Sequence, residues 1–154
     1  MKIKIINKSN FELPKYETKG SVGMDIKANI NESIKLIKNK QVLIPTGLYV
    51  ELPKPLIDNY TGEGYGYEIQ IRPRSGLSAK HGIIVVNSPG TIDCDYRGEI
   101  KVILMNLSDN VYTVKKGDRI AQMVVNRFER VLWNDVDEIN ETSRNDGGFG
   151  HTGK

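Results

Sequence analysis

Short runs in which polar and apolar residues alternate occur along most of this sequence, and they constrain its fold more than any other feature. The clearest runs cover residues 2–5, 24–28, 48–52, 68–72 and 100–104. Alternation in steps of two puts one set of side chains in a core and the other in solvent when the backbone is a strand. Turn-forming residues such as Thr46-Gly47 and Ser88-Pro89-Gly90 separate the runs. Many short strands with frequent turns predict an all-β protein, either a barrel or a sandwich.

Length and composition place these strands in one domain. A chain of 154 residues, with 38% hydrophobic and 27% charged residues, is long enough to bury its own core. Cys94 is the only cysteine, so no internal disulfide is expected, as in a reducing compartment. No apolar run approaches the roughly 20 residues of a membrane span, and residues 1–5 lack the apolar core of a signal peptide. We therefore expect a soluble, cytoplasmic protein that does not bind membranes.

Four segments break the alternating pattern. Residues 75–82 predict one short helix, with Ser75 as its cap and Gly82 at its end. Residues 54–66 contain Pro55 and three glycines and read as a long loop, and the acidic residues 134–141 read as a linker or a solvated strand edge. Residues 147–154 hold four glycines around Phe149. This end is either a frayed terminus or a flexible lid whose ring covers a ligand.

Two arginine-containing segments could bind phosphate. Arg72-Pro73-Arg74-Ser75-Gly76 puts two planar guanidinium groups beside a helix start, where backbone N–H groups also attract anions. Surface salt bridges are the alternative interpretation. Arg119 and Gln122 stand at the entrance of an apolar strand and could be further polar ligands, although by themselves they are better explained by a solvated turn.

A third segment carries closely spaced carboxylates. Asp93 and Asp95 are two residues apart, so both could point to one face, where a carboxylate could orient a water. Tyr96 could pack on a sugar. The alternative is a hairpin whose aspartates satisfy turn backbone groups.

Several other chemistries are not expected. Residues 148–154 spell G-x-x-x-x-G-K, but a P-loop continues with Ser or Thr and a helix, and here Lys154 ends the sequence. His81, His151 and Cys94 lack the spacing of a zinc site. The net charge of +3 is small, and aromatic residues are not interleaved with basic ones, so no nucleic-acid partner is expected.

Taken together and in order, five segments resemble the five motifs of the trimeric dUTPase family, whose members hydrolyse deoxyuridine triphosphate. The stretches PRSGL, ID-x-DYRGEI, GDRIAQ and GGFG-x-TG are each specific, and the similarity runs over residues 2–154. The five segments are residues 20–28, 72–82, 87–106, 117–125 and 144–153.

The resemblance implies a jelly-roll-like β-barrel with one short helix and a C-terminal arm exchanged between the subunits of a homotrimer. Residues 1–133 would form the barrel core, 134–143 a linker and 144–154 a glycine-rich lid. Each site would take its first, second and fourth motifs from one chain, the third from a second chain and the tail from a third. The implied reaction converts dUTP to dUMP and pyrophosphate.

The resemblance also implies residue roles. Asp93 would activate the attacking water and meet the deoxyribose 3′-hydroxyl, and Tyr96 would pack where a 2′-hydroxyl would clash. Mg²⁺ would be the cofactor and would be held mainly by the triphosphate and water, with no direct protein ligand. Asp25 and Arg119 would support the site. The remaining substrate-binding residues are Asn87, Ile100 and Lys101 for uracil, Arg74, Ser75, Gly76 and Gln122 for phosphates, and Arg144, Phe149, Gly150, His151 and Thr152 in the tail.

The sequence departs from the family pattern in three places. Asn145 follows Arg144 where the family has Gly, His151 replaces the usual Ser, and residues 54–66 are longer than the compact family loop. Two other functions stay open at this point: a dCTP deaminase, alone or combined with dUTP hydrolysis, and a non-catalytic dUTP-binding regulator.

Overall fold

Strands dominate the chain, which confirms the all-β prediction. The structure is a computed structural model and describes residues 1–148. Its single helix within that range is α1 (Ser75–His81). The strands are β1 (Lys4–Asn7), β2 (Met24–Lys27), β3 (Ile34–Leu36), β4 (Gln41–Pro45), β5 (Leu48–Glu51), β6 (Leu56–Ile57), β7 (Gly64–Arg72), β8 (Ile83–Val85), β9 (Gly90–Ile92), β10 (Lys101–Asn106), β11 (Tyr112–Val114) and β12 (Arg119–Arg130).

The strands form four hydrogen-bonded sheets around a common apolar core. The sheet that positions the site has the order β2-β12-β7-β6, with β9 also paired to β7. The others are β1-β5, β4-β10-β8 and β11-β3. Alternate residues of β10, Val102 and Leu104, are 1% exposed, as the period-two pattern predicts. The described part of one chain does not close these sheets into a barrel, and β1 pairs only with β5.

The helix begins one residue earlier than the sequence suggested. Arg74 is the N-cap, with extended backbone angles and no side-chain capping bond, so the prediction that Ser75 caps the helix is wrong. The carbonyl of Arg74 accepts the first bonds, from the N–H groups of Leu77 and Ser78. The predicted end is confirmed, because Gly82 has φ 66°, a left-handed conformation that glycine adopts without strain.

Residues 54–66 form a hairpin, so the prediction that they are one long loop is wrong. β6 and the start of β7 form a hairpin, and β7 pairs with β12 from Arg72 opposite Gln122 to Gly64 opposite Arg130. Glycine at position 64 is required here, because a Cβ would overlap the backbone carbonyl of Leu56. Gly64 therefore allows two strands to approach closely and Gly66 makes room for the Phe128 ring, whereas Gly62, with φ 74°, lies in the hairpin turn.

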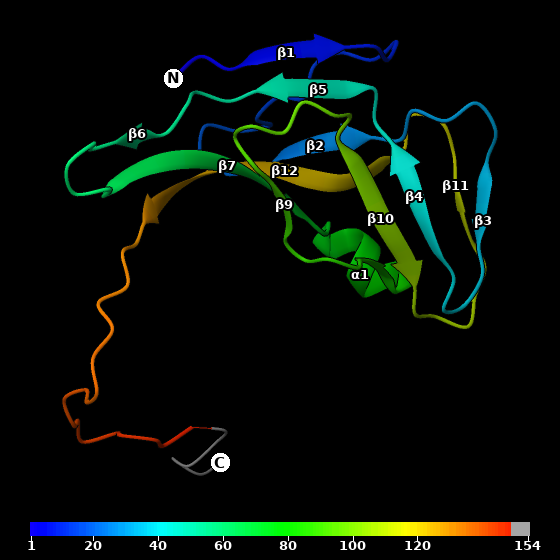
Figure 1. The fold of residues 1–154 in the computed structure, drawn as a ribbon. Helices are drawn as coiled ribbons and strands as arrows, with labels where there is room; N and C mark the ends of the chain where they lie inside the picture. The colour runs from blue at the N-terminus through cyan, green and yellow to red at the C-terminus, as the bar shows by residue number, and fades with distance from the viewer. Residues whose placement is uncertain (149–154) are drawn as a thin grey trace.

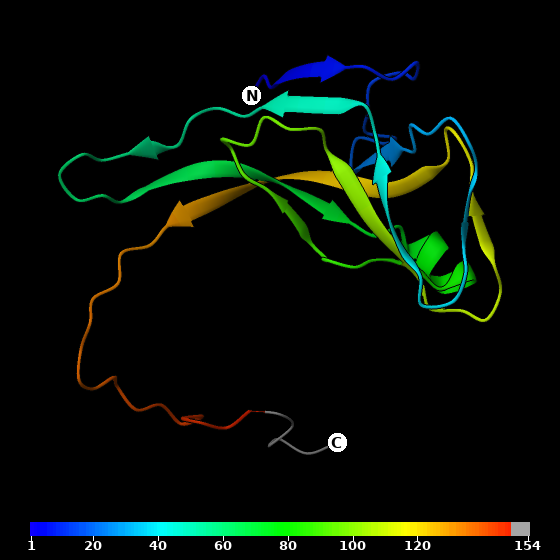
Figure 2. The ribbon, with the colours of Figure 1, turned by 45° about the vertical axis from the view of Figure 1, so that its right-hand side comes forward.

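After Arg130 the chain leaves the sheet as an extended segment. We call residues 131–148 the arm; none of them lies in a helix or strand. Figures 1 and 2 show the arm running away from the sheets in both views. Residues 131–146 are all exposed, and they include the apolar side chains of Val131, Trp133 and Ile139. No helix within residues 1–148 is long and apolar enough to cross a membrane.

Candidate functional site

The side chain of Asp25 on β2 is the centre of a polar cluster. It is only 10% exposed, and Arg74 Nε donates to its Oδ1 at 2.9 Å. Arg119 Nη1 lies 3.2 Å from Oδ2. Gln122 Nε2 also donates to Oδ1, at 3.4 Å. One carboxylate therefore holds two guanidinium groups and an amide in fixed positions.

Strand pairing explains why residues far apart in sequence meet at Asp25. β12 lies between β2 and β7, so that Gln122 is opposite Asp25 on one side and Arg72 on the other. Arg74 follows the end of β7 and also donates from Nη1 to the backbone carbonyl of Arg119 at 3.2 Å. Three of the five segments that the sequence singled out thus build one cluster within a single chain.

The charge and exposure of this cluster suit an anion. Two arginines face one aspartate, which leaves an excess of positive charge, and the Arg119 side chain is 52% exposed. Ser75 and Gly76, at the start of α1, are also exposed, and a Cβ on Gly76 would meet no atom within 4 Å. An incoming phosphate can therefore reach both the guanidinium groups and this stretch of backbone.

Asp93 lies in a turn that follows β9. The N–H of Tyr96 donates to the carbonyl of Asp93 at 3.1 Å, and both Asp93 and Asp95 are exposed. The alternative interpretation of this segment as a hairpin is wrong, because β9 pairs with β7 whereas β10 pairs with β4 and β8. The segment instead crosses from one sheet to another, so its aspartates are presented on a connection and not on a paired strand.

Local contacts hold this crossing in shape. Tyr96 is 42% exposed, and its hydroxyl donates to the carbonyl of Glu99 at 3.0 Å. Its ring lies so close to Gly98 that a Cβ there would overlap it. Arg97 Nη1 donates to the carbonyls of Cys94 and Tyr96, at 2.8 and 2.9 Å. The sequence indicates a turn at Arg97-Gly98, but it did not predict these contacts.

The residues expected to read the base have different environments. Asn87 is exposed, and its side chain packs against Gly90. Ile100 is fully buried, its N–H donates to the carbonyl of Leu48 and its carbonyl accepts from Thr46 Oγ1. Lys101 is exposed. The backbone groups of Ile100 are thus already used within the chain.

Within one chain, Asp93 lies apart from the Asp25 cluster. β9 runs antiparallel to β7, with Gly90 opposite Ile71 and Ile92 opposite Ile69. Asp93 therefore follows the end of β9 that is farther from Arg72. The three residues from Ile69 to Arg72 span about 10 Å at strand spacing, and Arg74 lies beyond them.

The tail residues are described only in part. Arg144 is exposed on the arm, and its Nε donates to the carbonyl of Gly147 at 2.7 Å. Phe149, Gly150, His151 and Thr152 lie outside the described residues. Within residues 1–148, no three His, Cys, Asp or Glu side chains come close enough together to hold a metal ion.

An all-β fold with an arginine-rich, carboxylate-anchored cluster is suited to a protein that binds an anionic ligand. The chain belongs to the dUTPase family, whose sequence profile matches residues 9–153. It is 51% identical to the deoxyuridine 5'-triphosphate nucleotidohydrolase of Fusobacterium nucleatum over 154 residues, covering 100% of this chain and 98% of that protein. It is 54% identical to the enzyme of the same name from Finegoldia magna over 153 residues, covering 99% of both chains.

Solved structures support the fold. A dUTPase of Staphylococcus bacteriophage 80alpha, solved with dUpNHpp, superposes with a TM-score of 0.78 at 21% identity and covers 99% of both chains. The dUTPase of phage phi11 of S. aureus, described with a structural Mg(II) ion, gives 0.75 at 20% identity and covers 92% of this chain and 100% of that chain.

Proposed function

We propose that this protein is a dUTP diphosphatase, which hydrolyses dUTP to dUMP and pyrophosphate. Such an activity limits uracil in DNA and supplies dUMP for thymidylate synthesis. The observation that carries the proposal is the cluster of Arg74, Arg119 and Gln122 around Asp25. It joins three family segments into an anion site, in a chain closely related to proteins named for this reaction.

In the proposed mechanism, Asp93 takes a proton from a water molecule that attacks the α-phosphorus. The bond to the bridging oxygen breaks, and pyrophosphate leaves. Arg74, Ser75, Gly76 and Gln122 hold the phosphates in line for this attack. Their positive charge and N–H groups offset the charge that develops in the transition state. The exposure of Asp93 leaves its carboxylate accessible to both water and substrate.

Mg²⁺ belongs to this proposal as an ion carried by the triphosphate. Phosphate oxygens and water would supply most of its ligands, because Mg²⁺ gives up its bound water reluctantly. When bound, the ion neutralises phosphate charge. The work of the protein is then to orient the nucleotide and to activate the water.

Substrate selection would fall to the crossing segment. Asn87 and the backbone near Ile100 and Lys101 would read the uracil edge, with Lys101 more available because the backbone groups of Ile100 are occupied. Tyr96, fixed against Gly98, would pack under deoxyribose and exclude a 2′-hydroxyl.

The assembly in this proposal is a homotrimer with shared sites. Asp93 stands apart from the Asp25 cluster within one chain, and the arm exposes apolar side chains, so both are suited to meet another copy. Arg144, Phe149, Gly150, His151 and Thr152 would then close over a neighbouring site. The proposal includes a cytoplasmic location and involves neither nucleic acid nor membrane as partner.

A pyrophosphate-release assay with dUTP, dTTP, UTP and dCTP tests the function. We expect dUTP to be hydrolysed far faster than the others, because a site that hydrogen-bonds one base edge leaves its polar groups unpaired with another. Ammonia release from dCTP would instead identify a deaminase, and tight dUTP binding without turnover would identify a regulator. Comparable rates with UTP and dUTP would contradict the assigned role of Tyr96.

A further inference from the structure

The hairpin of β6 and β7 forms a projecting ribbon together with the C-terminal half of β12. Figures 1 and 2 show this ribbon extending from the body of the sheets to the point where the arm begins. Pairing continues without interruption to Arg130 opposite Gly64, and β6 adds a short third strand through Leu56 opposite Tyr65. The end of β12 is thus held far from the anion-binding cluster by the hairpin alone.

Side-chain contacts stiffen the ribbon. The guanidinium of Arg127 lies 3.9 Å from the centre of the Tyr65 ring, a cation–π contact. The ring of Phe128 covers Gly66 so closely that no Cβ would fit. Arg127 also pairs with Glu129 at 2.7 Å. The first two contacts join β7 and β12, whereas the Arg127–Glu129 pair lies within β12.

The hairpin turn is tied down by Asp58. Its Oδ1 accepts hydrogen bonds from the N–H groups of Tyr60 and Thr61, at 2.9 and 2.8 Å, and these bonds lower the pKa of the Asp58 carboxyl. The N–H of Gly62 donates to the carbonyl of Asp58 at 2.8 Å. Such a turn keeps one shape because its backbone donors are satisfied locally.

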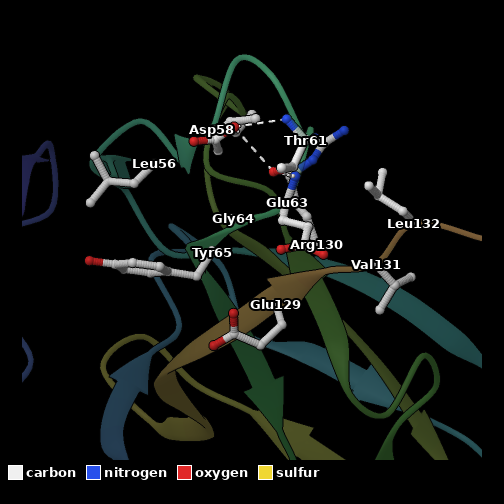
Figure 3. Close-up of a pocket in the computed structure, with 11 residues that line it drawn as sticks. Leu56, Asp58, Thr61, Glu63, Gly64, Tyr65, Glu129, Arg130, Val131 and Leu132 are labelled. Atoms are coloured by element: carbon white, nitrogen blue, oxygen red, sulfur yellow. Dashed lines mark hydrogen bonds between the residues drawn. The ribbon is translucent and has the colours of Figure 1, made fainter.

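The first residues of the arm pack beside this turn. Figure 3 shows a shallow hollow with the turn residues Asp58 and Thr61 on one side and Val131 and Leu132 on the other, where the chain leaves β12. Gly62 has no Cβ, but one built there would lie 3.4 Å from Leu132 Cδ2, so the Leu132 side chain lies beside the turn. The arm therefore meets the hairpin before it extends into solvent.

We infer that the β6–β7 hairpin is a brace that fixes where and in which direction the arm leaves the subunit, with Leu132 as the positioning residue. The inference depends on the proposed function, in which the end of the arm serves a site on another copy. A segment that pivots freely at Arg130 would spread its end over a large volume and lower its effective concentration at that site. A fixed exit direction keeps that concentration high.

Two variants test the brace in the assembled enzyme. Leu132→Ser removes most of the apolar side chain that lies beside the turn, and Gly64→Ala separates β6 from β7 because its Cβ would overlap the Leu56 carbonyl. Leu107→Ser is the matched control, because the two leucines have similar exposure, 50% for Leu107 and 55% for Leu132. Leu107 lies beside Gly82, at the end of α1. We expect the KM for dUTP to rise roughly 3- to 10-fold in both test variants, as the effective concentration falls. Leu132→Met should rescue the effect, and the control should not show it.

Trp133 provides a readout other than activity. It is the only tryptophan, it follows Leu132 directly and it is 92% exposed. Its fluorescence anisotropy should fall in Leu132→Ser, and this should hold in a chain truncated after Arg144, where docking of the tail cannot restrain the arm. Unchanged anisotropy would overturn the brace. Because Leu132 is exposed, this variant remains informative even when Gly64→Ala does not fold.

Combining each variant with the truncation separates a failure of the brace from a failure of the proposed role of the tail. If the brace acts through the tail, Leu132→Ser should change KM in the full-length enzyme and leave the residual activity of the truncated enzyme unaltered. An equal loss in both chains would show that Leu132 acts elsewhere, which overturns the inference. A truncated enzyme as active as the full chain would instead overturn the proposed role of the tail.

Discussion

Asp25 and Asp93 are two carboxylates of one candidate site in opposite environments. Asp25 is 10% exposed and is bound by Arg74, Arg119 and Gln122. Asp93 is exposed in a turn, and its backbone carbonyl accepts the turn bond from Tyr96. The Asp25 cluster is built from residues of one chain, whereas the Asp93 side chain faces solvent.

The two environments suit different roles, one in positioning phosphate-binding side chains and the other in activating water. A carboxylate whose oxygens are bound by two guanidinium groups has few free lone pairs with which to orient a water, but it can hold those groups in place for phosphates. An exposed carboxylate keeps its lone pairs available as a general base. The cluster proposed to bind phosphates is therefore arranged by the folding of one chain, whereas the proposed base is exposed and available to substrate.

The largest expected effect is at Asp93. Asp93→Asn keeps the shape but removes the basic oxygen, so turnover of dUTP should fall roughly 10²-fold or more. Binding of dUTP and the thermal unfolding midpoint should stay near those of the unchanged protein. Turnover close to normal would move the catalytic role elsewhere, with Asp95→Asn as the next variant to measure.

Mixing inactive chains tests whether the outward-facing region serves another copy. Asp93→Asn and a chain truncated after Arg144 should each be nearly inactive alone. Refolded together, some trimers combine an intact Asp93 from one chain with an intact tail from another, so activity should exceed the sum of the two. Light scattering and tagged pull-down verify assembly and exchange.

No gain in verified hybrids would place the whole site in one chain or make the tail dispensable. The truncated chain assayed alone distinguishes these outcomes. An inactive truncation favours a single-chain site, and an active one shows that the glycine-rich end is not needed.

Loss of Asp25 should affect stability as well as substrate binding. Asp25→Asn leaves two arginines without their counter-charge, and we expect a loss of about 1–3 kcal/mol in unfolding free energy, less than for a fully buried pair because Arg119 is half exposed. The KM for dUTP should also rise, since Arg74 and Gln122 lose their anchor. Urea unfolding and steady-state kinetics measure both. A variant with unchanged stability would contradict the view that this region is built within the chain.

The smallest expected effect is spectroscopic and reports on Arg74 alone. Burial raises the pKa of Tyr112, the charge of Asp118 raises it further, and the charge of Arg74 lowers it. Arg74→Gln should therefore raise the pKa of Tyr112, whereas Asp93→Asn should leave it unchanged. Ultraviolet titration, with Tyr112→Phe as the reference, measures the shift.

The sign of the accompanying stability change follows from the raised pKa. The protonated phenol is favoured in the folded state, so its contribution is present below the ordinary value of 10.0 and is lost as pH rises through the higher folded value. Arg74→Gln should raise the pKa of Tyr112 in the folded state, so the loss of stability should extend to higher pH. An unchanged alkaline unfolding profile would contradict the electrostatic effect of Arg74 on Tyr112.

Local pattern was enough to predict several elements. The alternation of residues 24–28 and 100–104 predicted β2 and β10, and Gly82 predicted the end of α1. Residues 54–66 misled the prediction, because glycine there permits a close approach of two strands and not a flexible loop. The N-cap was predicted one residue too late, at Ser75, because the helix begins directly after the extended residue Arg74.

By itself, the sequence determined which residues face a core, which segments turn and which side chains can bind phosphate. All of these follow from local backbone geometry and from side-chain chemistry. Only the tertiary structure decided that Asp25 meets Gln122, 97 residues away, and that Asp93 leaves the sheet at the far end of β9. Periodicity specifies the face of a strand, but it does not specify the partner or register of that strand. Partner and register depend on how all the apolar faces pack together, so they are decided only by the whole fold.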